Sequence, residues 1–328
     1  MLHLAFETSC DDTSIALMED DRLLQMVTRS QITEHLATQG VVPEVAARLH
    51  AHVIFEVLDE VLTAGKVTLS DIKYIDCTSE PGLLPSLLVG KTVAKTLARA
   101  LDIPLHWIHH IEGHIFANLL ERKVDDLIFP AVVLTVSGGH NEIYLWKSLY
   151  EWELLGQTRD DAAGEAFDKV AKAMGLGFPG GPIVAKYASE YTGVYQHLFP
   201  VPLLETESLD FSFSGLKSAV RREIETRRAT HGGILPEHDL QEIAFEFEQA
   251  IVSVLVTKLN RAAKKMGVST IMLAGGVSAN DFLRLSLDSL SKTEGYHFFA
   301  PVKKVYSMDN AAMIGVRGYY ESTRFAKI

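Results

Sequence analysis

Two histidines four residues apart, His110 and His114, carry the sharpest chemical signal in the sequence. On a helix, positions i and i+4 lie on the same face with about 6 Å between their side chains, so both imidazoles can bind one metal ion. A zinc peptidase of the HExxH type needs a glutamate directly after the first histidine, and Ile111 occupies that position. Glu112 lies roughly 200° around the helix from His110 and points away from the histidine face. The pair therefore predicts a metal site without the base that a peptidase requires.

Asp309 is the candidate for a third ligand. It precedes the last predicted helix, where a carboxylate could equally cap the helix N-terminus. Two histidines and one carboxylate leave coordination positions open, which suits a redox-inert Lewis-acid or template role. Fe²⁺ and Zn²⁺ both accept this ligand set, so the residue types do not separate them.

Three glycine-rich turns could hold an anionic ligand. Residues 137–140 (SGGH) follow a predicted buried strand, and the two glycines would let backbone N–H groups approach an anion, although a tight hairpin explains the string equally well. In residues 274–280 (AGGVSAN), a buried strand runs into Gly-Gly and a helix follows, which presents a helix N-terminus to an anion or simply caps that helix. Residues 179–182 (PGGP) form a rigid turn. Neither GxxxxGK[ST] nor an early GxGxxG occurs, so P-loop and Rossmann pockets are not expected.

Composition and charge narrow the class of protein. The chain has 328 residues, 47% of them apolar and 22% charged, as in an ordinary globular enzyme. Its net charge of −11 argues against coating nucleic acid by bulk electrostatics, although residues 217–228 and 258–265 form either local basic patches or solvated helix faces. Two cysteines are too few for a disulfide framework. No apolar run approaches the roughly 20 residues of a membrane span, and the first residues lack a basic signal region. We expect a cytoplasmic protein with no membrane association.

The order of predicted elements repeats along the chain. The first part predicts strands at 2–8, 14–19 and 23–30, a helix at 43–64, a strand at 72–78, a helix at 84–101 and a strand at 104–108. The second part predicts strands at 130–136, 142–146 and 152–157, a helix at 164–174, an irregular region to about 236, a helix at 240–265, a strand at 270–273, a helix at 281–291, a strand at 297–299 and a helix at 310–320.

This repetition predicts an α/β protein of two duplicated βββαβα lobes, the layout of the actin/Hsp70/sugar-kinase fold. The N-terminal lobe is expected at 1–108, closed by a C-terminal helix at 308–328. The C-terminal lobe is expected at 109–307, with a helical insertion at about 178–236. In this layout a phosphate-bearing ligand lies near the carboxyl ends of buried strands.

Nine ordered motifs carry a resemblance to one known family. They are residues 7–13 (ETSCDDT), 40–44 (GVVPE), 110–114 (HIEGH), 137–140 (SGGH), 160–169 (DDAAGEAFDK), 178–182 (FPGGP), 210–217 (DFSFSGLK), 274–280 (AGGVSAN) and 309–310 (DN). Together, from about residue 4 to about residue 316, they resemble the TsaD family of tRNA threonylcarbamoyladenosine enzymes.

The resemblance implies an acyltransferase that moves a threonylcarbamoyl group from threonylcarbamoyl-AMP to N6 of adenosine 37 in tRNAs that read ANN codons. The implied metal ligands are His110, His114 and Asp309, around one divalent ion per subunit, with Fe²⁺ expected ahead of Zn²⁺. The residues expected to hold the adenylate are Thr135, Val136, Ser137, Gly138, Gly139, Asp168, Gly181 and Asn280. Asp11 is expected near the reacting group, where it could accept the proton of the attacking amine. The implied protein partners are a degenerate paralogue of the same fold and a small ATPase.

Several positions depart from the family pattern, and two other functions stay open. Glu80 puts a carboxylate where glycine is usual, and Asn141 and Ala311 replace threonine and glycine. Ala185 stands where many members have aspartate, so no ligand is carried over to that position. An ATPase or sugar kinase of the same fold is one alternative. A non-catalytic scaffold paralogue is the other, although such paralogues typically lack the histidine pair that is intact here.

Overall fold

The computed structural model describes residues 1–38, 40–202 and 207–324. The chain forms two compact units: the first unit contains Met1–Asp126 and the segment from Pro301 onward, and the second unit contains Leu127–Ala300. The boundaries expected from the sequence were 108/109 and 307/308. They differ because the segment after the fifth strand packs on the C-terminal helix, which brings the histidine pair into the first unit. The last four residues of the expected C-terminal helix, 325–328, lie outside the described residues.

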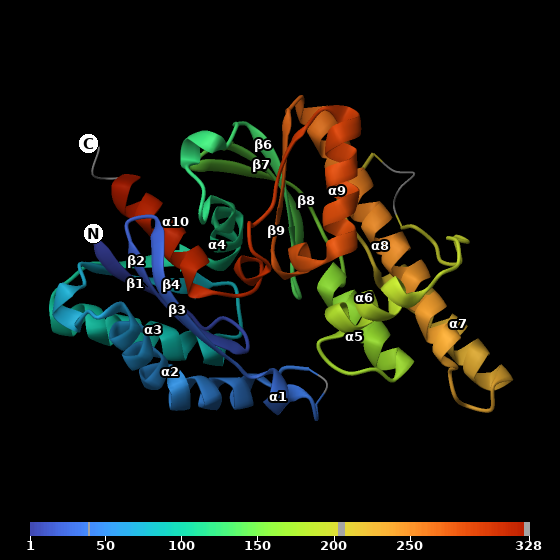
Figure 1. Cartoon of the computed structure of the whole chain (residues 1–328), viewed down its shortest axis with the longest axis horizontal. Helices are drawn as coiled ribbons and strands as arrows, with labels where there is room; N and C mark the ends of the chain where they lie inside the picture. The colour runs from blue at the N-terminus through green and yellow to red at the C-terminus, as the bar shows by residue number, and fades with distance from the viewer. Residues whose placement is uncertain (39, 203–206, 325–328) are drawn as a thin grey trace. The chain divides into compact units, whose positions relative to one another are not determined.

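The described part of the first unit contains a five-stranded sheet. Its strands are β1 (Leu2–Glu7), β2 (Asp12–Glu19), β3 (Arg22–Ser30), β4 (Tyr74–Glu80) and β5 (Leu105–His109). The order across the sheet is β3-β2-β1-β4-β5, with antiparallel pairs up to β1 and parallel pairs beyond it. Figure 1 labels β1, β2, β3 and β4. The five strands predicted for this part of the chain are confirmed to within two residues at each end.

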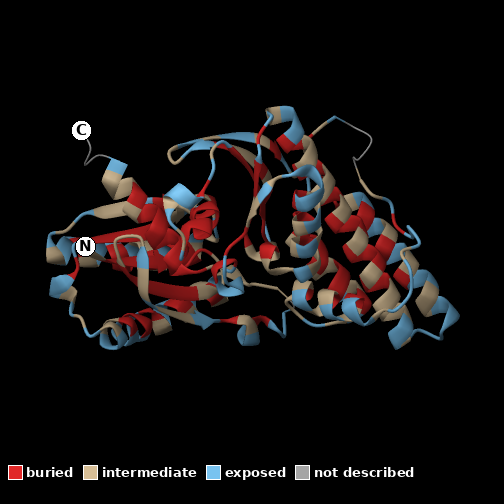
Figure 2. Cartoon of the chain, turned by 45° about the horizontal axis from the view of Figure 1, so that its top comes forward, coloured by how far each residue is buried: buried red, intermediate tan, exposed pale blue. Residues whose placement is uncertain are grey.

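Helices cover both faces of this sheet. They are α2 (Pro43–Gly65), α3 (Leu84–Leu101), α4 (His110–Phe116) and α10 (Ala311–Arg324), while the short helix α1 (Ile32–His35) follows β3. Because side chains alternate along a strand, Leu4 and Phe6 of β1 pack with α2 and α3 in one core. Ala5, between them, faces α10, where a Cβ on Gly315 would lie 3.2 Å from the Ala5 Cβ. The strands β1, β2 and most of β4 are therefore buried, as the red strands of Figure 2 show, whereas β3 and β5 are largely part-exposed.

The sheet of the second unit repeats the first. Its strands are β6 (Ala131–Val136), β7 (Asn141–Ser148), β8 (Glu151–Gln157), β9 (Thr270–Ala274) and β10 (His297–Phe299). The order is β10-β9-β6-β7-β8, again an antiparallel meander of three strands joined to two parallel strands. In chain order, the two sheets have the same topology and the same strand directions. The duplication predicted from element order is confirmed.

The helices of the second unit account for the rest of its core. They are α5 (Ala163–Met174), α6 (Gly180–Glu190), α7 (Ser214–Thr230), α8 (Glu237–Met266) and α9 (Asp281–Glu294). Phe167 of α5, Val220 of α7 and Phe247 of α8 belong to one buried cluster with Val132 and Leu134 of β6. The helices α6 and α7 fall within the region where a helical insertion was expected.

Short 3-10 helices occur at Leu69–Asp71, Ala117–Leu119, Val124–Asp126, Gly276–Ala279 and Lys304–Tyr306. Within the described ranges, no helix combines the length and the apolar character needed to cross a membrane.

Candidate metal centre and glycine cradle

The histidine pair lies on α4, which begins directly after β5 ends at His109. His110 is 7% exposed and His114 is fully buried. Their rings meet edge to face with centroids 4.6 Å apart, in keeping with the i, i+4 spacing. Gly113 lets α4 approach α10 closely, because a Cβ at this position would lie 2.8 Å from Cδ1 of Ile314. The predicted shared face of the two histidines is confirmed.

Asp309 lies just before α10 and faces both imidazoles. Its Oδ1 is 3.1 Å from Nε2 of His114 and 3.6 Å from Nε2 of His110. The first turn of α10 is capped by Asn310, whose Oδ1 accepts a hydrogen bond from the N–H of Met313 at 3.0 Å. Asp309 is therefore not the helix cap, and its carboxylate is turned to the histidines. We call His110, His114 and Asp309 the metal group.

The spacing of the metal group fits one divalent ion. One ligand atom from each of the three side chains lies within 4.8 Å of the other two. Nitrogen and oxygen atoms bound at about 2.0–2.1 Å in tetrahedral geometry are separated by roughly 3.3 Å, close to the distances between Asp309 and the two imidazoles. Both ring nitrogens of His114 are buried without an aligned hydrogen bond, including Nε2 despite its 3.1 Å approach to Asp309. A buried ring nitrogen that lacks a hydrogen bond is unfavourable, and an ion at Nε2 would give that nitrogen a partner.

Glu7, at the buried end of β1, orients His110. Its Oε2 accepts hydrogen bonds from Nδ1 of His110 at 3.0 Å and from the hydroxyl of Thr78 at 2.6 Å. This contact holds the Nδ1 proton and leaves Nε2 for a metal ion. Burial opposes charge on both groups, but attraction between His110 and the carboxylates of Glu7 and Asp309 outweighs it. The pKa of Glu7 is therefore lowered and the pKa of His110 is raised to about 9. Glu7 was not predicted as a site residue, although a carboxylate at the end of a buried strand was a signal for one.

Glu112 has a different partner. Its Oε2 accepts a hydrogen bond from Nε of Arg317 on α10 at 2.8 Å. The prediction that Glu112 points away from the histidine face is confirmed. It is not placed to act as the base of a metallopeptidase.

Asp11 lies in the loop between β1 and β2. His50 of α2 fixes this loop, because its Nε2 donates to the carbonyl of Cys10 at 3.0 Å while its Nδ1 accepts from the hydroxyl of Thr13 at 2.7 Å. Burial raises the pKa of Asp11, and the hydrogen bond with Cys10 opposes that change only in part. A carboxyl group with a raised pKa is suited to proton exchange closer to neutral pH. Asp11 is not a member of the metal group.

In the second unit, the SGGH segment forms the turn between β6 and β7. The N–H of Ser137 donates to the carbonyl of His140 at 2.8 Å, and the Ser137 hydroxyl accepts from the N–H of His140 at 3.1 Å. Gly138 and Gly139 at the tip are exposed, and a Cβ on either would meet no atom within 4 Å. The segment is thus a closed hairpin turn whose tip backbone is open to a ligand.

Other glycines are needed for packing around this turn. A Cβ on Gly164, in the first turn of α5, would lie 2.6 Å from the carbonyl oxygen of Ser137. A Cβ on Gly275, whose φ is +86°, would lie 2.4 Å from the carbonyl oxygen of Val136. These close contacts hold the start of α5 and the loop after β9 against the end of β6.

Asp168 lies on α5 and faces the start of α6, whereas Gly181 and Asn280 lie at the starts of α6 and α9. Oδ1 of Asp168 accepts from the N–H of Gly180 at 2.7 Å, at the first residue of α6. A Cβ on Gly181 would meet no atom within 4 Å. Asn280 caps α9, because its Oδ1 accepts from the N–H of Leu283 at 2.8 Å. We call the exposed turn glycines together with these three residues the glycine cradle; its members are Gly138, Gly139, Asp168, Gly181 and Asn280.

Two other residues predicted to hold the adenylate, Thr135 and Val136, are buried in β6. Val136 packs in the core of the second unit. The hydroxyl of Thr135 has no hydrogen-bond partner among the described residues. Their side chains therefore support the turn from beneath and do not reach its exposed tip.

Hydrogen bonds and ion pairs join the motifs at 160–169 and 210–217. Oδ1 of Asp160 accepts from the N–H of Phe213 at 2.8 Å, directly before α7 begins. The carboxylate of Asp161 accepts from Lys169 at 2.7 Å and from Lys217 at 2.5 Å. These bonds tie α7 to α5, so most of both motifs serves the packing of the second unit.

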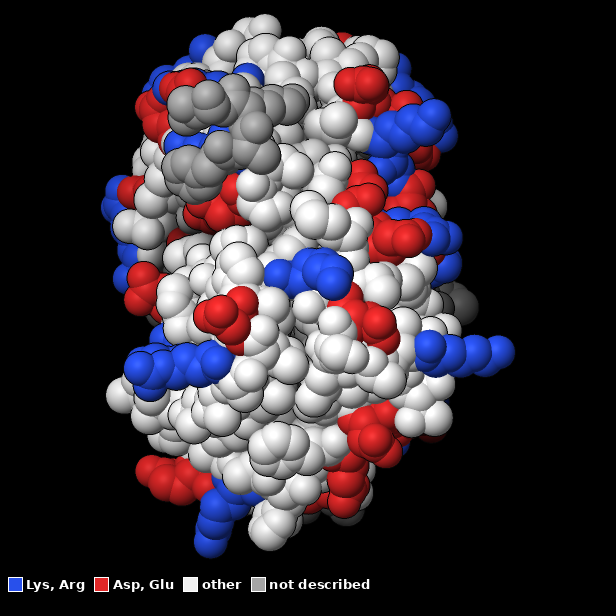
Figure 3. Space-filling view, turned by 90° about the vertical axis from the view of Figure 1, so that its left-hand side faces the viewer, with Lys and Arg blue, Asp and Glu red and all other residues white. Residues whose placement is uncertain are grey.

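Most of the basic side chains in residues 217–228 and 258–265, which the sequence offered as local basic patches, are ion-paired or buried. Lys258 is fully buried, Lys264 lies 2.6 Å from Glu294, and Arg221 lies 2.9 Å from Glu225. Figure 3 faces the first unit, which does not contain these two stretches, and there charges of both signs are interspersed among the described residues. These contacts favour solvated, ion-paired helix faces over extended basic patches.

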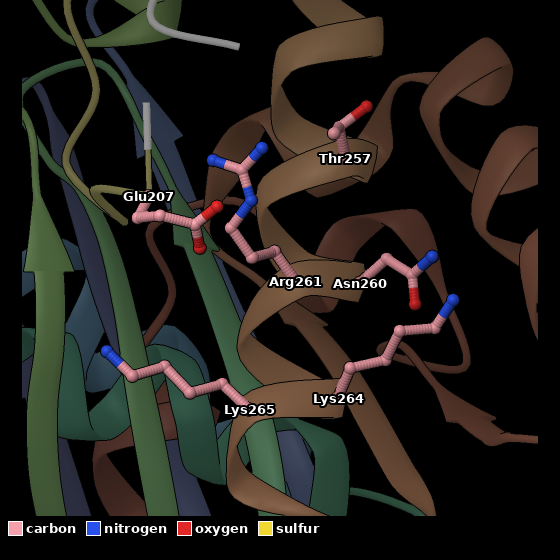
Figure 4. A pocket seen from close by; sticks show the side chains of 6 residues that line it. All are labelled: Glu207, Thr257, Asn260, Arg261, Lys264 and Lys265. Atoms are coloured by element: carbon pink, nitrogen blue, oxygen red, sulfur yellow. The ribbon is translucent and has the colours of Figure 1, made fainter. Parts of the chain in front are cut away.

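A hollow of about 520 Å³ lies beside the C-terminal half of α8 (Figure 4). It is lined by Glu207, Thr257, Asn260, Arg261, Lys264 and Lys265. This end of α8 leads into the start of β9, whereas the AGGVSAN turn follows the end of β9. The hollow and the glycine cradle therefore lie at opposite edges of the sheet, and the hollow is not the predicted nucleotide site.

The departures from the family pattern have different surroundings. Glu80 is exposed at the end of β4. Asn141 is fully buried at the start of β7, and its amide has no hydrogen-bond partner among the described residues. Ala311 begins α10, where its N–H donates to the hydroxyl of Ser14 at 3.0 Å. None of these three residues belongs to the metal group.

Comparison with known proteins decides the family. The sequence matches the profile of TsaD, tRNA N6-adenosine threonylcarbamoyltransferase, over residues 22–316. The chain belongs to the TsaD family. Curated TsaD relatives include a protein of the same name from Syntrophotalea carbinolica, 44% identical over 97% of this chain and 91% of the relative. Another, from Staphylococcus epidermidis, is 45% identical over the same shares.

Solved structures agree with the fold. HypF, in its phosphate- and nucleotide-bound form, superposes with a TM-score of 0.61 at 14% identity, covering 98% of this chain and 46% of HypF. Component A of the (R)-2-hydroxyglutaryl-CoA dehydratase of Acidaminococcus fermentans superposes with a TM-score of 0.56 at 11% identity, covering 98% of this chain and 99% of that protein. At such identities the likeness concerns the fold alone. This TsaD chain has the duplicated α/β lobes of the actin/Hsp70/sugar-kinase fold.

Proposed function

We propose that this TsaD chain transfers the threonylcarbamoyl group from threonylcarbamoyl-AMP to N6 of adenosine 37 in tRNAs that read ANN codons. Its relatives are named for transfer to N6 of a tRNA adenosine. The observation that carries the choice of an adenylate donor is the set of open glycines in the cradle. A Cβ on Gly138, Gly139 or Gly181 would meet no protein atom within 4 Å, so the fold itself leaves these positions unfilled. These three glycines also lie at a strand-to-strand turn and at a helix start, where a ligand can approach the backbone closely.

The cradle offers the contacts that an adenylate needs. The backbone N–H groups at the SGGH tip, and those at the starts of α6 and α9 that Asp168 and Asn280 do not use, can receive a phosphate, since a helix N-terminus carries partial positive charge. In the proposed reaction these groups stabilise AMP as it leaves. The side chains of Asp168 and Asn280 supply polar contacts to the nucleoside.

The metal group is proposed to hold one Fe²⁺, with Zn²⁺ as the other ion that its ligand types accept. When bound, the ion would supply Lewis-acid polarisation of a substrate oxygen. His110 and His114 provide Nε2 atoms and Asp309 provides a carboxylate oxygen. Glu7 keeps the His110 ring in the tautomer that makes Nε2 available.

Asp11 is proposed as the acceptor of the amine proton. The exocyclic amine of adenine is a poor nucleophile because its lone pair is conjugated with the ring. As the new N6–C bond forms and the C–O bond to AMP breaks, one amine proton must leave. The Asp11 carboxylate would take this proton, and its raised pKa brings it closer to the range where such transfer is effective.

The test is a tRNA modification assay with synthetic threonylcarbamoyl-AMP, read out by mass spectrometry of the nucleosides. We expect wild-type protein, with its partners, to form threonylcarbamoyladenosine, and Asp11→Asn to abolish transfer while AMP affinity changes by less than about threefold. Transfer at the wild-type rate by Asp11→Asn would remove Asp11 from this role. No modified adenosine from the wild type, together with robust sugar phosphorylation, would favour the kinase alternative.

The partners and the location of the protein are part of the proposal. A chain of net charge −11 has an unfavourable long-range field for tRNA, and its basic stretches are largely ion-paired. We therefore propose that efficient tRNA binding requires protein partners, and the family resemblance implies that these are a degenerate paralogue of the same fold and a small ATPase. Both cysteines are free thiols, which suits the cytoplasm.

A further inference from the structure

A buried carboxylate, Glu248, stands behind Asn280 of the cradle. It lies on α8 and is 6% exposed. Its Oε1 accepts a hydrogen bond from Nδ2 of Asn280 at 2.7 Å, and among the described residues this is its one hydrogen bond. Burial raises the pKa of Glu248, an effect that the hydrogen bond from Asn280 opposes. Burying a carboxylate costs solvation free energy, which a compensating role of the residue would offset.

Two contacts fix the orientation of the Asn280 amide. Its Oδ1 accepts from the N–H of Leu283, and its Nδ2 donates to Glu248. A backbone N–H can only donate and a carboxylate can only accept. If the Asn280 amide were flipped, its NH₂ group would meet the N–H of Leu283 and its oxygen would meet the carboxylate of Glu248, and both hydrogen bonds would be lost. The amide is therefore held in one orientation from both sides.

This orientation decides what Asn280 can offer a ligand. The carbonyl oxygen of the amide is used by the helix cap, and one N–H is used by Glu248. The second N–H of the amide has no acceptor among the described residues. Asn280 therefore has one amide N–H left to donate to a ligand. The complementary acceptor on a nucleoside is a ring nitrogen or a ribose oxygen.

We propose that Glu248 is a positioning residue for the adenylate, which holds Asn280 as a donor toward a hydrogen-bond acceptor of the nucleoside. This inference rests on the proposed adenylate site and adds to it the residue that orients Asn280 and the polarity of the contact.

The experiment measures AMP affinity by calorimetry on the full chain. Glu248→Met removes the acceptor at nearly constant volume, and we expect it to weaken AMP binding about tenfold, as for loss of one good hydrogen bond. Glu248→Gln keeps an acceptor for Nδ2 of Asn280 and should bind AMP within about threefold of the wild type.

Glu246 provides the matched control. It also lies on α8 and is 1% exposed, but its carboxylate accepts from the backbone N–H groups of Gln196 and Leu198 at 2.6 and 2.9 Å. Glu246→Met should lower the stability of the second unit without a selective loss of AMP affinity. If Glu246→Met weakened AMP binding as much as Glu248→Met does, the effect would be structural and the proposal would be wrong.

A double variant separates the possible outcomes. In the Asn280→Ala background, Glu248→Met should cause no further loss of affinity, because the two residues act as one unit. A full additional loss there would overturn the positioning role. Wild-type affinity in Glu248→Met with weakened binding in Asn280→Ala would refute the role of Glu248 and leave the adenylate site standing. Wild-type affinity in both single variants would refute the adenylate site as well.

Discussion

The metal group of the first unit and the glycine cradle of the second unit occupy duplicated lobes but use different chemistry. In the metal group, two imidazoles from α4 and a carboxylate from the segment before α10 converge on one point, and Glu7 reaches His110 across 103 positions of sequence. In the cradle, exposed backbone at a turn and at helix starts is offered, and several of its residues have no side chain at all.

This difference sets how each site should respond to mutation. A site made of converging side chains fails when one of them is shortened, whereas a site made of open backbone fails when a side chain is added. The strand framework is the same in both lobes, so the contrast comes from the loops and helices attached to the strands. Five experiments follow, beginning with the largest expected effect.

Removing a metal ligand should have the largest effect. His110→Ala or His114→Ala should abolish stoichiometric metal binding and most of the transfer activity, because two protein ligands hold a divalent ion far less tightly than three. Metal content of anaerobically purified protein, by mass spectrometry, is the measurement. His109→Ala is the control, since His109 ends β5 outside the metal group and its loss should leave the metal in place. One bound ion per chain in either ligand variant would refute the assignment.

The second experiment changes Glu7, the residue that orients His110, and leaves the metal group intact. Glu7→Gln should lower metal affinity by about 10- to 100-fold, the usual effect of replacing a carboxylate behind a metal-bound histidine. Affinity is measured by competition with a chelator. Glu112→Gln changes a carboxylate of the same unit that pairs with Arg317, and its metal affinity should match the wild type. Equal loss in both variants would mean that general destabilisation, and not orientation of His110, controls binding.

The third experiment compares two glycines of the second unit. Gly138→Ala should weaken AMP binding about tenfold and leave unfolding by urea unchanged, because its Cβ would point into open space. Gly164→Ala should lower the free energy of unfolding by about 1–3 kcal/mol, since its Cβ would lie 2.6 Å from a backbone oxygen. Unchanged AMP affinity in Gly138→Ala would show that the phosphate of AMP does not bind at this turn.

The smallest expected effect is in the pH dependence of stability. Burial raises the pKa of Asp12 from its usual 3.8 to about 7, so the folded state binds an extra proton between these values. Stability from this group is therefore present at acidic pH and falls as pH rises through that range. Urea unfolding from about pH 4 to 7 should show a smaller decline in Asp12→Asn than in the wild type. An equal decline in the variant and the wild type would contradict the raised pKa of Asp12.

Asp160 of the second unit should show the opposite sign. Burial opposes its ionisation, but hydrogen bonds from Ser212, Phe213 and Ser214 outweigh this and lower the pKa of Asp160. Its stabilisation is therefore present above its usual pKa and is lost as pH falls toward the lowered value. In Asp160→Asn, the loss of stability on acidification should be smaller than in the wild type.

Much of the framework and part of each site followed from the sequence, because local periodicity controls them. The i, i+4 spacing of His110 and His114 placed both imidazoles on one face of α4 before any packing was known. Alternating apolar strands separated by polar turns predicted both sheets, and their repeated order predicted the duplication. These features depend on neighbours within a few residues along the chain.

The remaining features were decided by tertiary packing, since they depend on contacts between distant segments. The sequence left two roles open for Asp309, a helix cap or a partner of the histidine pair. The packing of α4 on α10 turns its carboxylate to the histidines, and Asn310 caps the helix. Burial made Lys258 part of the core and not of a basic surface. Glu7 behind His110 and Glu248 behind Asn280 are the same kind of case: a partner more than 30 residues away is chosen by the fold, and no local pattern encodes it.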